Sequence, residues 1–148
     1  MITIFIFSAQ SAQDSSKLSG EIVEIVIKIV VPNYDKLPDI QKQQIKENFS
    51  LIVRKLAHFT EFATLGFFLM LHILSYKPYI KSFNLKMFIR ACIGWGIGSF
   101  YAVTDEFHQM FVTDRYSSVY DVFIDSSGVL FGIIILILSL PLFIKKMS

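Results

Sequence analysis

Residues 122–144 read VFIDSSGVLFGIIILILSLPLFI, and this stretch decides the fold because it is long and apolar enough to cross a bilayer. A transmembrane helix needs about 20 consecutive residues that are predominantly apolar. Two further runs, Leu56–Tyr76 and Met87–Thr104, meet the same requirement. The sequence therefore predicts an all-α integral membrane protein, a helical bundle in a single domain over residues 1–148, with three full transmembrane helices at 56–76, 87–104 and 122–144.

The composition agrees with a membrane protein and excludes an ordinary soluble domain. Of the 148 residues, 53% are hydrophobic and 18% are charged, whereas soluble domains average about 25% charged residues. The single cysteine, Cys92, excludes an internal disulfide and a cysteine-based zinc site. The basic residues are not interleaved with aromatic residues on a polar face, so we expect the lipid bilayer and no nucleic acid as a partner.

The lysines and arginines predict how the helices cross the membrane. Short cytoplasmic loops are enriched in basic residues. The connection between the first two spans and the start of the second span contain four basic residues and no acidic residue (Lys77, Lys81, Lys86 and Arg90). The C-terminus contains two more basic residues, Lys145 and Lys146. We therefore expect a multi-pass protein with a cytoplasmic C-terminus. The opposite ends of the three spans then lie together at the outer face.

The N-terminal third is predicted to lie outside the membrane. Met1–Phe7 is apolar but too short to span, so we interpret it as a partial N-terminal span whose beginning is missing, with a short interfacial anchor as the alternative. Residues 8–53 would form an external loop. Within this loop, four charged residues at helical spacing form one stripe, and the other faces are aliphatic (Lys17, Glu21, Glu24, Lys28). This pattern predicts an amphipathic helix that lies at the membrane interface or in a groove between spans.

A second helix is expected after this element. Pro32 and Asn33 end the amphipathic helix, and Asp39, just after Pro38, is a candidate N-cap for the next one. Apolar residues then continue at helical spacing toward the first span, so the second helix is predicted to run straight into it (Ile45, Phe49, Ile52, Leu56). Small-residue pairs, Gly94 with Gly98 and Gly128 with Gly132, predict close contacts between the spans.

Ionisable residues gather where the three spans meet the predicted outer face. His58 and Glu61 open the first span, Asp105, Glu106 and His108 close the second, and Asp121 and Asp125 open the third. Ionisable groups inside membrane segments are rare and usually mark function or pairing. The candidate catalytic residues are His58, Glu61, Asp105, Glu106 and His108. The candidate ligand-binding residues are Arg54, Lys55, Gln109, Arg115, Asp121 and Asp125.

Two interpretations of this cluster compete. In the structural one, Arg115 and the two histidines pair with carboxylates and lock the helices together. In the functional one, the cluster forms a polar pocket that binds a ligand or performs acid–base chemistry. No cofactor is identified by a motif, but His58, Glu61, Asp105 and His108 are candidate ligands for a divalent metal through nitrogen and oxygen atoms.

Four stretches carry a resemblance to a known family: FSAQSAQDSSKLS at 7–19, RKLAHFTEFATLG at 54–66, YAVTDEFHQMFVTDR at 101–115 and YDVFIDSSGVLFG at 120–132. With them the chain resembles the VanZ-like family of small bacterial membrane proteins, named for a protein associated with teicoplanin resistance. The chain departs from the family where Thr113-Asp114 replaces a usual Pro-Gly and where the first span is incomplete. The residues that match the family pattern are Arg54, Lys55, His58, Glu61, Asp105, Glu106, His108, Gln109, Arg115, Asp121, Asp125 and Gly128.

The resemblance implies a multi-pass protein of the bacterial plasma membrane and does not supply a reaction. The leading hypothesis is a cell-envelope protein whose outer polar pocket binds a cell-wall or lipid-linked ligand, linked by resemblance to glycopeptide resistance. The first alternative is a membrane enzyme that modifies an envelope lipid or peptidoglycan precursor by acid–base or metal-assisted chemistry. The second is a non-catalytic scaffold, and a proton-coupled transporter is the third.

Overall fold

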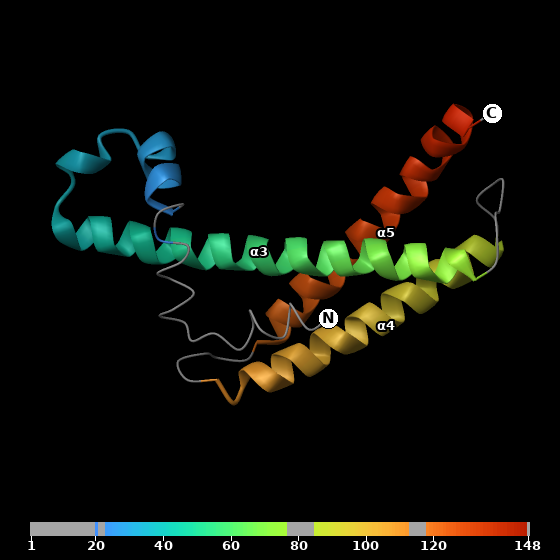
Figure 1. Cartoon of the computed structure of the whole chain (residues 1–148). Helices are drawn as coiled ribbons and strands as arrows, with labels where there is room; N and C mark the ends of the chain where they lie inside the picture. Colours follow the sequence, from blue (N-terminus) through green and yellow to red (C-terminus); the bar gives the residue numbers. More distant parts are fainter. Residues whose placement is uncertain (1–19, 21–22, 77–84, 113–117, 148) are drawn as a thin grey trace.

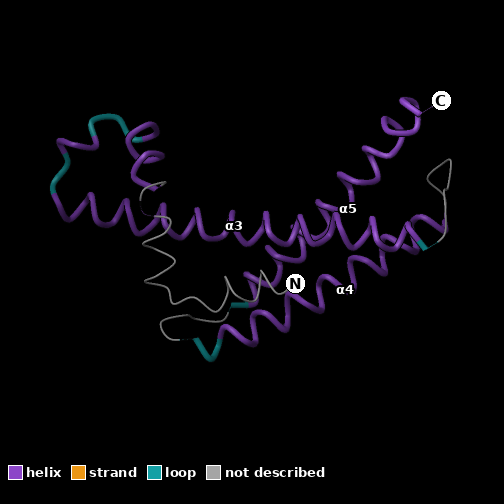
Figure 2. Tube along the Cα trace, in the orientation of Figure 1, coloured by secondary structure: helices purple, strands orange, loops and turns teal. Residues whose placement is uncertain are grey.

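The computed structural model describes residue 20 and residues 23–76, 85–112 and 118–147. Within these ranges the chain is helical and contains no strand (Figures 1 and 2). A short 3-10 helix, η1 (Tyr34–Lys36), precedes three long helices: α3 (Asp39–Ser75), α4 (Leu85–Gln109) and α5 (Val119–Met147). Each long helix is apolar and long enough to cross a membrane. The predicted all-α membrane fold with three full spans is therefore confirmed.

Helix α3 merges two predicted helices into one. It runs for 37 residues without a break, a length of about 56 Å at 1.5 Å per residue, which exceeds the hydrocarbon thickness of a bilayer. Its N-terminal part thus extends beyond the apolar run. The expectation that Asp39 caps the helix is wrong, because Pro38 occupies the cap position and no side chain caps the end. The Asp39 carboxylate instead lies 3.7 Å from the Lys42 ammonium.

The three long helices pack against one another around an apolar core. Helix α4 runs antiparallel to α3 and α5, so the end of α4 and the start of α5 lie at the same end of the bundle (Figure 1). The connection between them covers only residues 110–118. The core consists of buried side chains from all three helices (Phe62, Met70, Met87, Ala102, Val129, Ile133 and Leu136).

Glycines allow α3 and α5 to approach until their backbones touch. A Cβ on Gly132 would overlap the backbone of Ala63 and Phe67, and a Cβ on Gly128 would collide with the carbonyl oxygen of Phe59. Gly66 of α3 lies in the same way against the backbone of Val129. Such small-residue contacts drive association of membrane helices, where no hydrophobic effect acts between them. The other predicted pair also lies against neighbouring helices. Gly94 faces side chains of Ile73 in α3 and Ile133 in α5, and Gly98 faces the side chain of Val129 in α5.

The amphipathic segment folds back onto the beginning of α3. Residues 23–30 are helical, and Asn33 after them adopts a left-handed backbone conformation with φ of 60°. Val23 and Ile27 are buried, in a small cluster with Tyr34 and with side chains of α3 (Ile45, Phe49 and Val53). The segment therefore packs on the part of α3 that precedes the apolar run, and not in a groove between spans. Met1–Phe7, Lys17 and Glu21 lie outside the described residues.

The charged stripe of this segment is partly described. The Lys28 ammonium lies 3.1 Å from the Glu24 carboxylate, and Lys46 of α3 approaches the same carboxylate at 3.9 Å. The hydrogen bond from Lys28, together with its charge, lowers the pKa of Glu24. These pairs are exposed to solvent, so their contribution to stability is small. The buried Val23 and Ile27 hold the segment in place.

Candidate functional site

The polar residues of the three helices meet around one cavity. It has a volume of about 360 Å³ and lies where α4 ends and α5 begins, at the level of residues 51–58 of α3. Eight of its ten lining residues are polar or charged, and Leu51 and Ile124 are the apolar ones. The lining residues are Leu51, Arg54, Lys55, His58, Glu106, Gln109, Ser118, Asp121, Ile124 and Asp125.

His58, Asp105 and Asp125 come together from three different helices. One ligand atom from each, a ring nitrogen of the histidine and a carboxylate oxygen of each aspartate, lies within 4.8 Å of the others. Asp105 and Asp125 are both only 2% exposed. The Oδ1 atom of Asp125 accepts no hydrogen bond from any described residue. Two buried carboxyl groups and an imidazole thus converge on one point of the protein.

Neighbouring groups hold the ends of α4 and α5. Gln109 donates a hydrogen bond of 3.0 Å from its Nε2 to Oδ2 of Asp105, one helical turn earlier. Glu106 accepts a hydrogen bond of 2.5 Å from the backbone N–H of Ser118, which directly precedes α5. The Ser118 hydroxyl accepts one from the backbone N–H of Tyr120. A carboxylate and a hydroxyl therefore satisfy backbone donors at the start of α5, where helices leave such donors open.

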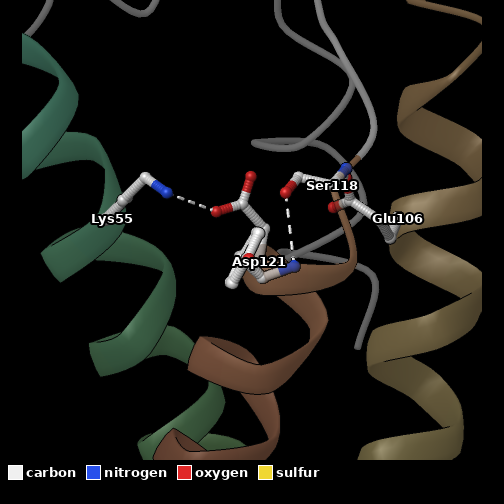
Figure 3. A network of polar contacts seen from close by, with 5 residues as sticks. Lys55, Glu106, Ser118 and Asp121 are labelled. Atoms are coloured by element: carbon white, nitrogen blue, oxygen red, sulfur yellow. Dashed lines mark hydrogen bonds and ion pairs between the residues drawn. The ribbon is translucent and has the colours of Figure 1, made fainter.

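Two basic residues of α3 lie at the cavity. The Lys55 ammonium reaches across to α5 and forms an ion pair of 2.7 Å with the Asp121 carboxylate (Figure 3). Both side chains are substantially exposed, so this pair contributes at most about 1 kcal/mol. Arg54 lines the same cavity and forms no ion pair with a described residue. Its guanidinium can therefore bind a phosphate or carboxylate through two parallel hydrogen bonds.

Most of the residues predicted from the sequence meet here, but not all of them. Glu61, Asp105 and His108 do not line the cavity, although Asp105 belongs to the converging group. Glu61 and His108 each lie three positions from a residue of that group, and at 100° per residue this turns a side chain about 60° away along the helix surface. The metal ligands expected from the sequence were His58, Glu61, Asp105 and His108. In the structure Asp125 stands with His58 and Asp105 instead.

One predicted residue is not described, and three lining residues were not predicted. Arg115 lies outside the described residues. Ser118 was missed as a site residue, although a serine directly before an apolar helix is a common N-cap and was available as a signal. Leu51 and Ile124 were also missed, because nothing in an apolar residue distinguishes a cavity wall from a lipid contact.

Comparison with known proteins gives the family of the chain. A family model described as VanZ/LLP1 matches residues 1–141, nearly the whole length. Neither a curated protein nor a solved structure matches the chain. The matched range includes α3, α4, the Val119–Pro141 part of α5 and every residue of the cavity wall. The chain therefore belongs to the VanZ/LLP1 family and is a multi-pass membrane protein of that family.

Proposed function

We propose that this protein binds, in the cavity between α3, α4 and α5, the anionic headgroup of a lipid-linked ligand of the bacterial cell envelope. The observation that carries the proposal is the position of the cavity. Most of its lining residues are polar or charged, and it lies where the apolar runs of the three helices end on one side of the bundle. A headgroup in it remains attached to a lipid chain that stays in the bilayer. The exposed apolar side chains of the helices provide the surface for that chain.

Arg54 supports an anionic headgroup as the ligand. It faces the cavity without an acidic partner among the described residues, and arginine is suited to bidentate recognition of phosphate. A lipid-linked cell-wall precursor fits this description, because its headgroup is joined to the lipid by phosphate. Such a ligand also accords with the resemblance to a family named for a teicoplanin resistance protein.

We place the cavity at the outer face of the plasma membrane. The basic residues Lys86 and Arg90 stand at the opposite end of α4, and basic residues are enriched on the cytoplasmic side. This orientation leaves the cavity open to envelope lipids. The C-terminal Lys145 and Lys146 would then lie in the cytoplasm.

Replacing Arg54 by glutamine is expected to weaken headgroup binding by at least about tenfold, because a hydrogen bond to a charged group contributes roughly 1.5–3 kcal/mol. The probe is dioleoyl phosphatidic acid, with zwitterionic dioleoyl phosphatidylcholine as the reference lipid. Native mass spectrometry of the purified protein in detergent gives the dissociation constants. We expect the wild type to prefer phosphatidic acid, and Arg54→Gln to lose the preference.

The matched control is Lys86→Gln, which removes an exposed cation from the other end of the bundle. It tests whether any basic residue attracts the lipid, and we expect binding within about twofold of wild type. Equal binding of both lipids by the wild type, or equal losses in the two variants, would contradict the proposal.

A further inference from the structure

We propose that His58, Asp105 and Asp125 form a binding site for a divalent transition-metal ion beside the cavity, whose wall includes His58 and Asp125. The inference deepens the proposed function and rests on it in one respect, because the bound ion would hold the phosphate of the headgroup. Binding of the ion itself requires no lipid. The two claims can therefore be tested separately.

The geometry suits an ion held between helices. One nitrogen and two carboxylate oxygens already lie within 4.8 Å of one another. Ligands around a tetrahedral zinc ion are about 3.3 Å apart, so the three side chains need to close by at most roughly 1.5 Å. Each ligand comes from a different long helix, and sites on rigid elements are held more accurately than sites on loops.

The burial of Asp125 is the independent observation that points to a ligand. Its side chain is 2% exposed, it lines the cavity, and its Oδ1 atom accepts no hydrogen bond from a described residue. A buried carboxylate oxygen without a hydrogen bond destabilises the protein. Asp105 beside it is equally buried. A divalent cation between the two aspartates would neutralise both charges and satisfy the open oxygen.

The surroundings of the ligands also fit a metal site. Gln109 donates to Asp105 and fixes the direction of its carboxylate, as residues behind metal ligands commonly do. Three protein ligands leave at least one coordination position open, as in zinc sites that bind water or substrate. His58 and Asp125 both line the cavity, so the open position faces it.

The ligand set selects the ion. Carboxylates alone suit Mg²⁺ and Ca²⁺, whereas imidazole favours Zn²⁺ and other transition metals. Because His58 supplies one of three ligands, we expect Zn²⁺ or Mn²⁺ to bind more tightly than Mg²⁺. The ion would also change the charge of the cavity. Two positive and three negative side chains line it, so a divalent ion converts an acidic wall into one that attracts a phosphate.

The test is isothermal titration calorimetry of the full-length protein, freed of metal with EDTA, against ZnCl₂, MnCl₂ and MgCl₂. We expect one Zn²⁺ or Mn²⁺ per chain and at least about 100-fold weaker binding in His58→Ala and Asp125→Asn. Loss of a metal ligand weakens metal binding at least as much as loss of a residue that hydrogen-bonds to a ligand. Asp125→Asn preserves shape, so it carries the test if His58→Ala does not fold.

Glu61→Gln and His108→Ala are the matched controls. They remove the two other polar residues expected from the sequence as metal ligands, and we expect them to bind the ion as the wild type does. The proposal is overturned if the wild type binds no stoichiometric transition metal, if Asp125→Asn binds like the wild type, or if the controls lose binding equally.

A second titration separates the ion from the headgroup. Phosphatidic acid binding is measured with Mn²⁺ and again after EDTA, and we expect it to weaken by about tenfold without the ion. If the ion binds but the lipid does not, the metal site stands and the proposed function fails. If the lipid binds equally with and without the ion, the link between them is wrong.

Discussion

We expect Gly132→Ala to lower the free energy of unfolding by about 1 to 3 kcal/mol, the usual range for overpacking a tight contact. Helix propensity alone predicts the opposite sign, because alanine stabilises a helix relative to glycine by up to about 1 kcal/mol. The contact between α3 and α5 decides the outcome. An added Cβ at Gly132 overlaps the Ala63 backbone, which cannot rotate away as a side chain can. The two helices must therefore move apart.

Gly96→Ala is the matched control for this prediction. Gly96 lies in α4, and a Cβ there meets nothing within 4 Å. The same chemical change should then leave stability unchanged or raise it slightly. Circular dichroism during titration with sodium dodecyl sulfate measures both variants. Equal stability of Gly132→Ala and Gly96→Ala would show that α3 and α5 are not in backbone contact.

Asp125→Leu is expected to stabilise the metal-free protein while it abolishes metal binding. Removing a buried carboxylate that lacks a hydrogen bond at Oδ1 relieves about 1 to 3 kcal/mol. For a chain of this length the melting temperature would rise by roughly 3 to 9 °C. Leucine is also a better helix former than aspartate. Such a trade of stability against binding is typical of residues that serve function.

The scaffold alternative predicts the reverse result. If Asp125 tied the helices together, its loss would lower the melting temperature. The matched control is Asp121→Leu, four residues earlier on the same helix, which breaks the 2.7 Å ion pair with Lys55 and should bring no gain. Thermal melts in EDTA compare the variants. A lower melting temperature for Asp125→Leu than for the wild type would support the scaffold.

Much of the fold follows from the sequence for clear physical reasons. A run of about 20 apolar residues can satisfy its backbone inside a bilayer only as a helix or in a closed barrel. Three such runs joined by short connections must alternate in direction. The end of the second therefore meets the start of the third, and this alone brings Asp105 and Glu106 close to Asp121 and Asp125. The apolar spacing from Ile45 to Leu56 also predicted that α3 continues without a break.

The rotation of each helix could not be predicted in this way. Whether His58 or Glu61 faces the cavity depends on how α3 is turned about its axis. That rotation is determined by contacts such as Gly132 against Ala63, which involve residues far apart in the sequence. The same applied to α4, where Glu106 and Gln109 line the cavity and Asp105 and His108 do not. Asp125 was consequently predicted as a ligand-binding residue but not as a neighbour of His58.

The central claim is that the cavity binds an anionic lipid headgroup, and photocrosslinking tests it most directly. The probe is an anionic phospholipid that carries a diazirine on its headgroup, added to the wild-type protein in detergent. Mass spectrometry of the labelled peptides locates the headgroup. We predict labelling within residues 51–58 and 118–125, which line the cavity. Equal labelling of Phe107 and Phe111, which are exposed near the same end of α4 but do not line the cavity, would contradict the claim.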